Sequence, residues 1–463
     1  MANLSPIVDT LKSKTPARLM PTLASSKAEE RATSCLLASF MVIPNFAQAV
    51  LKQAGAPSGK RLRSQCFTEV VFNDDTDDEQ LSRPDGLIIV TNGVTTWTAL
   101  VEAKVGNNPI SGEQVERYLD LAKKHKVDAL ITISNQYAPS ENILPYNVKA
   151  NKLRSVSCTH YSWHSILATA ILVSADKVTN DVEQSFILDD LVNFLDHPNS
   201  GISAMSSLHK DWKVLCEDIH SRKPISKASL ATNNAVNSWL QQLRSSGINL
   251  SKAIHQPIEI YLNNEQKKDP SKLLKSFLDE VSTDHILSAE YIIPNAAGRI
   301  KFSADIVRRS LETCIRIDAP RDVSRQTAAV NWLTRQLKKT SSSNIIIRAY
   351  WPKRIPMTAA PLVELFEKPE LLLPESKEMP KAFEVVLSTD LQGKFKQVKT
   401  IVDESNKLLI QFYVDAGQHI NNWVPKAPKV LKTKILNVEL THDELSVIEN
   451  NSDDLSGVVN PNL

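Results

Sequence analysis

The sequence predicts an α/β protein with two domains, on three observations. At 463 residues the chain is long enough for two or three domains with full hydrophobic cores. Apolar residues recur at helix-like and strand-like spacings, and the first part of the chain follows the order α-β-β-β-α-β. This periodicity lapses in HPNSGISAMSS, residues 197–207, before a second series of helices and strands begins.

These patterns divide the chain into an arm, two domains and a tail. Residues 1–24 are polar and interrupted by prolines, so we expect a flexible arm. The first domain is expected over residues 25–200, and a second, α/β (α+β) domain over 208–425. Residues 426–463 are polar with few apolar anchors, which predicts a mostly flexible tail.

Composition and charge narrow the class of protein. Apolar content of 42% and charged content of 23% are those of an ordinary globular protein. A formal net charge of +2 gives no global basic field that would indicate nucleic acid, and it leaves a local patch open. The five cysteines are scattered and form no C-x-x-C, which favours a reducing compartment and argues against structural zinc. With no signal-peptide core and no apolar run of ~18 residues, we expect a cytoplasmic protein without a membrane partner.

The first helix is expected from Ser26, where Glu29 three residues later completes a capping box. CFTEVVF, residues 66–72, is expected to be a strand, and the acidic loop NDDTDDEQ after it to be solvated. Residues 83–104 then form a β-hairpin that turns at Asn92-Gly93, the strongest short hairpin signal. One face of the first helix is expected to carry Ala32, Cys35, Leu36, Ser39, Phe40 and Ile43.

Helices and strands continue beyond the hairpin. The next helix is expected from about Ser111 to Lys126, and the strand DALITISNQ at 128–136. A strand near 154–161 and a helix from about Ser162 follow. In the second domain the expected elements are helices near 208–220 and 233–246, strands at 300–307, 312–319, 344–351 and 384–388, and helices over Arg325–Lys338 and near 394–420.

The hairpin carries ionisable residues where a purely structural strand pair would have none. If the Asn-Gly dipeptide is a two-residue loop, Asp85 lies opposite Leu100, and Glu102 is its diagonal neighbour on the same face. Such neighbours are roughly 7–8 Å apart, so both carboxylates can reach one ion. Lys104 lies two residues further and faces the same side. Two close carboxylates repel each other, and Mg²⁺ or Mn²⁺, which take oxygen ligands and retain waters, would resolve that conflict.

Pro84-Asp85 and Glu102-Ala103-Lys104 together resemble the motif of the PD-(D/E)XK phosphodiesterase superfamily, the restriction-endonuclease-like nucleases. The αβββαβ order over residues of about 25–175 resembles the core of that superfamily as well. The resemblance implies that Asp85 and Glu102 bind the metal ion, and that Lys104 orients water and stabilises charge developing on the phosphate. A metal ion in such a site lowers the pKa of bound water and neutralises charge on the scissile phosphate.

Two further E-x-K triplets, Glu265–Lys267 and Glu375–Lys377, occur in polar contexts without a preceding hairpin aspartate. The hairpin triplet alone ends an apolar strand. The structural alternative at this place is a salt bridge between Lys104 and either carboxylate at the rim of the sheet.

Gln114 and Tyr118, in EQVERYLDLA, lie one helical turn apart on one face. The spacing resembles a Q-x-x-x-Y helix element in the recombination-exonuclease branch of the superfamily, which implies contact with metal-site water or nucleic acid. The alternatives are structural, because Ser111-x-x-Gln114 is itself a capping box and Tyr118 fits a half-buried core position.

Three glutamates are candidates for the extra carboxylate that many members of the superfamily carry. Glu29 shares the face of the first helix that points to the sheet, which Glu30 does less well, and the capping box is an equal alternative for Glu29. Glu69 is the third candidate, because a charged residue between Phe67 and Val71 is costly to bury without a partner.

The second domain has a basic stretch over residues 300–354. Trp332 and the run Tyr350-Trp351-Pro352-Lys353-Arg354 place aromatic side chains among these cations, a composition typical of nucleic-acid surfaces. The alternative is an amphipathic helix with a solvated basic face and Trp332 in the core.

The sequence therefore favours a divalent-metal-dependent nuclease domain fused to an α/β accessory domain. The resemblance favours DNA as the substrate and genome defence or DNA processing as the setting. Two alternatives stay open: a nuclease-like module that binds nucleic acid or a protein partner without cutting, and an RNA nuclease. The complete set of Asp85, Glu102 and Lys104 argues against a degenerate site. The oligomeric state is open, a dimer included.

Overall fold

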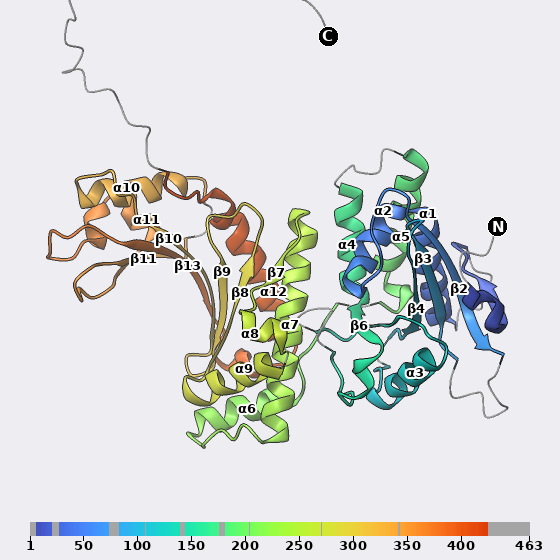
Figure 1. Ribbon diagram of the computed structural model, residues 1–463. Coiled ribbons are helices and arrows are strands. Elements are labelled where there is room, and N and C mark those ends of the chain that lie inside the picture. The colour runs from blue at the N-terminus through green and yellow to red at the C-terminus, as the bar shows by residue number, and fades with distance from the viewer. Residues whose placement is uncertain are drawn as a thin grey trace, which may run out of the picture. The chain divides into compact units, whose positions relative to one another are not determined.

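The computed structural model is an α/β protein with two sheets (Figure 1). The chain divides by its contacts at Trp423, and the described residues before it form one compact unit. The expected tail, 426–463, lies outside the described residues. The structure describes residues 6–20, 27–73, 83–106, 108–138, 144–175, 181–202, 204–269, 271–340 and 343–424.

The first sheet is mixed and has the strand order β1-β2-β3-β4-β5-β6. Strands β1 to β4 pair antiparallel with their neighbours, whereas β4, β5 and β6 pair parallel. The strands are β1 (Leu11–Pro16), β2 (Arg63–Phe72), β3 (Gly86–Thr91), β4 (Thr96–Ala103), β5 (Ala129–Ser134) and β6 (Ser157–Ser162).

Helices cover both faces of this sheet, because its central strands are apolar on both sides. Ile88 and Val101 face a core shared with α1 (Ala28–Val42), α2 (Pro44–Leu51), α4 (Trp163–Ala175) and α5 (Val182–Asp196). Leu87 and Leu100 face the other core, shared with α3 (Gly112–Lys124). Alternation along the strands therefore places Asp85 and Glu102 on the α3 face.

The expectation of a flexible arm over residues 1–24 is wrong for its middle part. Pro6–Thr10 form a 3-10 helix, and β1 pairs with β2 as the edge strand of the sheet. Val8 is 1% exposed and Ile7 9%, both in the core next to α3. An edge strand bonds to one neighbour only, so it needs few apolar residues of its own, and the polar sequence concealed it.

The first helix begins at Ala28, and its N-cap is Lys27, whose side chain makes no capping bond. Ser26 lies outside the described residues, so the capping box expected between it and Glu29 stays a prediction. The predicted inner face is confirmed, since all of its members are buried: Ala32, Cys35, Leu36, Ser39, Phe40 and Ile43.

The hairpin forms, but with a different register from the predicted one. Its loop runs from Asn92 to Thr95, and the Asn92 side chain accepts hydrogen bonds from the backbone N–H groups of Val94 (3.0 Å) and Thr95 (2.9 Å). This Asx turn is preferred to the two-residue loop that we predicted. Gly86 pairs with Val101, so the register continued by one residue sets Asp85 opposite Glu102 rather than opposite Leu100.

The second sheet has the strand order β12-β11-β13-β10-β9-β8-β7, and every neighbouring pair is antiparallel. The predicted helix near 394–420 is shorter and begins at Thr400, and the strand β8 was not predicted. The strands are β7 (Glu259–Ile260), β8 (Ile286–Ile292), β9 (Ile300–Asp305), β10 (Ser310–Asp318), β11 (Ile345–Tyr350), β12 (Thr358–Pro361) and β13 (Ala382–Asp390). The helices are α6 (Asp211–His220), α7 (Leu230–Ile254), α8 (Asn264–Lys268), α9 (Ser271–Thr283), α10 (Gln326–Gln336), α11 (Leu362–Leu365) and α12 (Thr400–Asp415).

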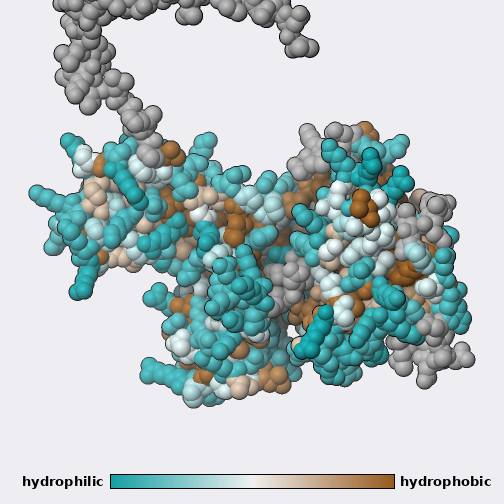
Figure 2. Space-filling model, viewed as in Figure 1, coloured by the Kyte–Doolittle hydropathy of each residue, from teal (hydrophilic) through white to brown (hydrophobic). Residues whose placement is uncertain are grey.

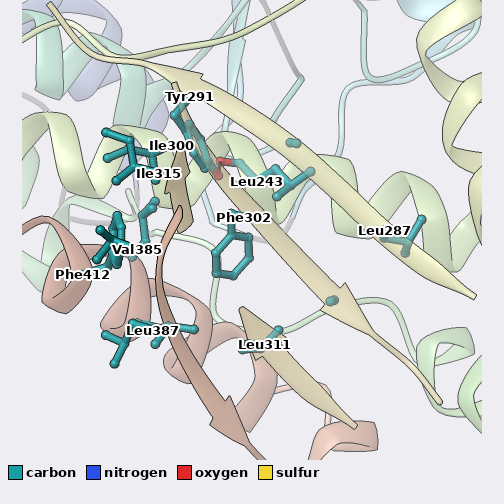
Figure 3. Close-up of a cluster of buried hydrophobic side chains, with 14 of the residues drawn as sticks. Leu243, Leu287, Tyr291, Ile300, Phe302, Leu311, Ile315, Val385, Leu387 and Phe412 are labelled. Atoms are coloured by element: carbon teal, nitrogen blue, oxygen red, sulfur yellow. Dashed lines mark hydrogen bonds between the residues drawn. The ribbon is translucent and has the colours of Figure 1, made fainter. Parts of the chain in front are cut away.

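The core of the second domain lies between its sheet and its helices (Figure 3). Phe302 of β9 and Phe412 of α12 are each 0% exposed. Tyr291 is equally buried, and its hydroxyl donates to the Leu243 carbonyl of α7 at 2.7 Å. A buried phenol that finds a backbone acceptor loses little from desolvation, so the tyrosine stabilises this core.

The segment from Gly201 to Leu208 connects the two domains, and its two ends form hydrogen bonds with different domains. The Gly201 carbonyl accepts from the backbone N–H of Gly106 (2.7 Å) and from Asn135 Nδ2 (2.9 Å), both near the first sheet. Leu208 N–H donates to the Val398 carbonyl (2.9 Å), next to α12. The first domain therefore includes Gly201, just beyond its predicted end.

No single helix among the described residues is long and apolar enough to cross a membrane. Ala28–Val42 and Pro44–Ala54 reach that length and composition only as a pair, and the pair is bent by 114°. The face drawn in Figure 2 is mostly hydrophilic, with hydrophobic residues in small separate patches.

Candidate active site

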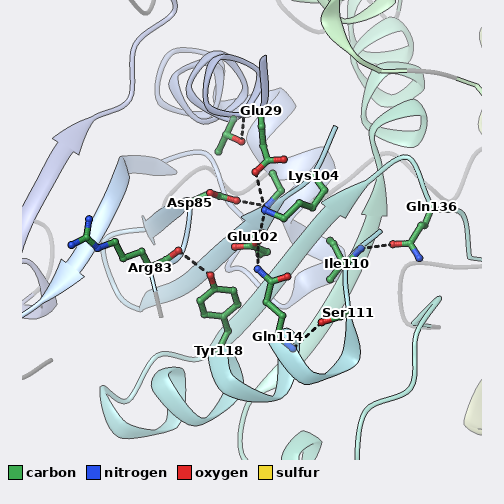
Figure 4. Close-up of polar contacts among 12 residues, drawn as sticks. Glu29, Arg83, Asp85, Glu102, Lys104, Ile110, Ser111, Gln114, Tyr118 and Gln136 are labelled. Carbon is green, nitrogen blue, oxygen red and sulfur yellow. Dashed lines mark hydrogen bonds and ion pairs between the residues drawn. The ribbon is translucent and has the colours of Figure 1, made fainter. Parts of the chain in front are cut away.

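The ionisable residues of the hairpin converge at one end of the first sheet (Figure 4). Asp85 directly precedes β3, Glu102 lies in β4, and Lys104 directly follows β4. Helix α3 contributes Gln114 from the same face, and Glu29 reaches Lys104 from α1. The structure therefore brings together five of the predicted site residues from four elements.

Glu102 is the most deeply buried member of the group, at 1% exposure. Its Oε1 atom accepts a hydrogen bond from Gln114 Nε2 at 2.6 Å and lies 2.7 Å from Lys104 Nζ. Its Oε2 atom is also buried and makes no hydrogen bond of ordinary geometry with the described residues, although the Tyr118 hydroxyl lies near enough to the carboxylate to lower the pKa of Glu102. A buried carboxylate oxygen without a donor is costly, so a ligand at this atom would stabilise the site.

Asp85 is half-buried and is fixed across the hairpin. Its Oδ2 atom accepts a hydrogen bond from the Ala103 N–H at 2.8 Å, so the carboxylate lies beside the strand end that carries Glu102 and Lys104. Gly86 follows it for a steric reason: a Cβ there would lie 2.5 Å from Leu37 Cδ1 and 3.1 Å from the Phe67 carbonyl oxygen. A side chain at position 86 would have to displace the end of the Leu37 side chain and would crowd the Phe67 carbonyl of β2.

Lys104 is held at both its backbone and its side chain. Its N–H donates to the Ile133 carbonyl at 2.8 Å, and its own carbonyl accepts from Trp163 Nε1 at 2.9 Å. Its Nζ atom lies 2.7 Å from Glu102 Oε1 and 2.8 Å from Glu29 Oε1. Trp163, which is 0% exposed, was not predicted as part of the site, and no sequence signal distinguishes it from a core tryptophan.

The pKa values of the group indicate that its negative charges are incompletely compensated, which favours binding of a cation. Burial, followed by repulsion from Glu102, raises the pKa of Asp85 well above its usual range. Burial also raises the pKa of Glu102, although Lys104 acts in the opposite direction. Burial disfavours the charge on Lys104, but attraction to Glu102 and Asp85 outweighs it and raises the pKa of the lysine. One positive side chain therefore does not fully compensate the carboxylates.

Gln114 and Tyr118 both serve the site, in different ways. Ser111 is the N-cap of α3 and accepts from the Gln114 N–H at 3.2 Å, but the Gln114 side chain binds Glu102 and does not complete a capping box. Tyr118 is 4% exposed, and its hydroxyl donates to the Arg83 carbonyl at 2.9 Å. Tyr118 therefore anchors the segment that leads into Asp85.

The three candidate glutamates separate clearly. Glu29 is the one that joins the group, through Lys104. Glu30 instead pairs with Lys27 at 2.8 Å. Glu69 is exposed and meets Asp85 only through the backbone, its N–H donating to the Asp85 carbonyl at 3.3 Å. The exposure of Glu69 corrects the expectation that this side chain would need a buried partner.

Two carboxylates are enough for the metal ion that we expect. The described residues include no group of three or more His, Cys, Asp or Glu side chains arranged to hold a metal ion. Mg²⁺ binds through one or two carboxylates and retains several waters. Asp85 and Glu102 supply that pair, and Oε2 of Glu102 offers a ligand atom. These residues therefore fit Mg²⁺ or Mn²⁺.

The aromatic side chains of the basic stretch make contacts within the second domain. Trp351 is 7% exposed, and its Nε1 donates to Thr358 Oγ1 at 2.9 Å. The Arg316 guanidinium lies over the Tyr350 ring, 4.1 Å from its centre. Trp332 packs against the core, as the plain alternative expected. These aromatic rings are therefore already in contact with the protein itself.

The other E-x-K triplets lie away from any strand end. Glu265–Lys267 belong to the short helix α8, and Glu375–Lys377 to a loop.

No family model matches the chain, and no curated protein or solved structure matches it either. The chemical interpretation of the site therefore rests on its residues and their geometry.

Proposed function

We propose that the first domain is a divalent-metal-dependent nuclease of the PD-(D/E)XK type, which hydrolyses phosphodiester bonds, with DNA as the favoured substrate. The observation that carries the proposal is the buried Glu102, which lies next to Asp85 and Lys104. Its Oε2 atom accepts no hydrogen bond of ordinary geometry from the described residues, whereas its Oε1 atom contacts Lys104. The succession α1, α2, β2, β3, β4, α3, β5 supports a restriction-endonuclease-like core, because apart from the additional helix α2 it follows the αβββαβ order. A purely structural carboxylate would be expected to have both oxygens bonded.

In this proposal Asp85 and Glu102 hold the ion. The ion, when bound, acidifies a water molecule and neutralises charge on the scissile phosphate. The protein contributes a rigid setting, because the Asp85 carboxylate is fixed by the Ala103 N–H and the Glu102 carboxylate by Gln114. Such fixed groups need little rearrangement when charge develops.

Lys104 is the proposed electrostatic catalyst. Its backbone carbonyl is anchored by Trp163, its ammonium group lies next to Glu102, and 21% of its side chain is exposed. A cation placed there stabilises negative charge that grows on the phosphate in the transition state. Gln114 acts indirectly, because its side chain orients the Glu102 carboxylate.

A binding module that does not cut is the second candidate. The observation in its favour is that Lys104 already has two carboxylate partners, Glu102 and Glu29, as a structural ion network would have. The two candidates differ in one measurement. Incubating the full chain with plasmid, linear duplex, single-stranded DNA and RNA, with Mg²⁺ or with EDTA, should give metal-dependent products from at least one substrate if the nuclease proposal holds.

Lys104→Ala should lower the cleavage rate by a factor of about 100 to 1000 and leave substrate binding nearly unchanged, because the charge acts mainly in the transition state. The measurement is the single-turnover rate together with the affinity for an uncut oligonucleotide. Lys152→Ala is the matched control, since Lys152 also forms an ion pair in this domain, with Asp120 at 2.6 Å. Cleavage by Lys104→Ala at the wild-type rate would reduce Lys104 to a salt-bridge partner.

A further inference from the structure

A hollow of about 550 Å³ opens directly beside Asp85. It lies between β1 and the segment after it, the start of α1, the bulged end of β2, and the segment leading into β3. Asp85 is part of its lining, so the hollow and the candidate metal site share a residue. This size is that of an ordinary ligand-binding cleft.

Two arginines on the wall of the hollow are exposed and unused. Neither the Arg18 nor the Arg83 guanidinium has a hydrogen bond or an ion pair with any residue that the structure describes. Lys14, the third cation of the lining, donates to the Val8 carbonyl at 3.0 Å. Arginine binds phosphate oxygens through its planar fork of donors, so these two side chains are suited to an anionic ligand.

The backbones of both arginines are fixed, although their guanidinium groups have no partner among the described residues. Arg18 N–H donates to Ser34 Oγ at 2.9 Å, and Ser34 Oγ donates back to the Arg18 carbonyl at 3.0 Å. The Arg83 carbonyl accepts from Tyr118, and Figure 4 shows the guanidinium extending away from that contact. An anchored backbone lowers the conformational freedom that a bound ligand must remove.

The side chains that line the hollow include three cations and three carboxylates. Lys14, Arg18 and Arg83 oppose three carboxylates of the lining: Glu30, Glu69 and Asp85. Glu30 is already neutralised by Lys27 at 2.8 Å. With Glu30 paired to Lys27 the hollow has a positive excess, and a divalent cation at Asp85 would increase it, so an anionic ligand is most favoured in the metal-bound protein.

We infer that this hollow holds the phosphate backbone of a nucleic-acid strand next to the bond that is cut, with Arg18 and Arg83 each binding one phosphate. The inference rests on the proposed function. None of the described residues that line the hollow is aromatic, and the Ser34 hydroxyl is bonded to Arg18. Contacts of this kind position the strand and carry no sequence information.

The test measures binding in the full chain that carries Lys104→Ala, with Mg²⁺ present, so that the oligonucleotide stays intact. Adding Arg18→Ala and Arg83→Ala should weaken binding about tenfold or more near 50 mM salt. The dependence of log K on log salt should flatten by about 1.4 for a single strand or 1.8 for a duplex, as expected for two lost phosphate contacts. Two oligonucleotides of unrelated sequence should lose affinity equally.

Arg61→Ala with Arg63→Ala is the matched control, because both arginines are exposed at the other end of β2, where Arg63 pairs with Thr91. An equal loss in the control would show a general charge effect and overturn the inference. Unchanged affinity and slope in the Arg18 and Arg83 variant, or a loss that depends on sequence, would overturn it as well. Cleavage by the wild type is measured separately. If the wild type gives metal-dependent products but the Arg18 and Arg83 variant binds normally, the inference about the hollow is wrong and the nuclease proposal stands. If the wild type gives no metal-dependent products, the nuclease proposal itself is wrong.

Discussion

Asp85 is the residue whose charge the metal-free protein accommodates least. Its pKa is raised by burial and by Glu102, so the folded state binds its proton more tightly than the unfolded state does. A raised pKa adds stability below the unfolded value of about 3.9, and that stability is lost as the pH rises through the folded value. In EDTA, the stability of Asp85→Asn should therefore fall less than that of the wild type as the pH rises above about 4.

At neutral pH the same variant should be at least as stable as the wild type without metal, because asparagine keeps an acceptor for the Ala103 N–H. Millimolar Mn²⁺ or Mg²⁺ should stabilise the wild type by about 1.4 kcal/mol at ten times Kd, and Asp85→Asn much less. Asp120→Asn, at an exposed acid on α3, should keep the full increment. A strongly destabilised Asp85→Asn and a wild type that ignores both ions would identify a structural ion network.

At the scale of residues, the sequence predicted which side chains meet but not how they bond. Period-two alternation was sufficient to place Asp85, Glu102 and Lys104 together. The orientation of Gln114 was not predictable, since a glutamine at that position of a helix can equally cap it. The contact between Trp163 and the Lys104 carbonyl depends on parallel strands far apart in sequence, and no local pattern contains it.

Among the elements, β1 with its 3-10 helix is the one that local sequence patterns missed, and its role is testable. Val8 is 1% exposed in the core next to α3, so Val8→Ala should lower the free energy of unfolding by about 2 kcal/mol. Val94→Ala, at a loop valine that is 92% exposed, should change it by less than about 0.5 kcal/mol. Denaturant unfolding measures both. Equal stabilities of the two variants would mean that the N-terminal segment contributes no packing.

The hairpin illustrates how far a local signal reaches. Asn92-Gly93 correctly located the turn, but the number of loop residues depends on the bonds that Asn92 makes to Val94 and Thr95. The predicted loop was two residues too short. Because the difference is an even number, each side chain still lies on the face of the sheet that was predicted for it. The corrected register brings Asp85 closer to Glu102 than predicted.

For the whole molecule, the buried residues fall into two sets of cores, apart from the small cluster of Tyr137, Ala168 and Ile248, and this distribution predicts two folding units. The cores around the first sheet use residues from Ile7 to Leu195, with Ile202 packed against them, and the largest core uses Leu208 to Ile420. We expect a fragment of residues 1–207 to unfold cooperatively on its own, as followed by circular dichroism and calorimetry.

A shorter fragment, residues 1–196, is the control for that expectation. It lacks Gly201, whose carbonyl accepts from Gly106 and Asn135 near Lys104, so it should melt at a lower temperature. A fragment 1–207 without a cooperative transition would contradict the division. The sequence indicated this boundary through a lapse in periodicity, whereas the topology of the second sheet, with β13 between β10 and β11, depends on pairings too distant in sequence for any local pattern.

The position of β1 also has a consequence during protein synthesis. Leu11 pairs with Phe72, so roughly 60 residues must be made after β1 before its partner is complete. At about 5–20 residues per second, the ribosome needs roughly 3 to 12 seconds for that interval. Throughout it, the nascent strand is free to pair with other chains. Lys12, Lys14 and Pro16 oppose such pairing, so the polar composition that concealed the strand protects it while it waits.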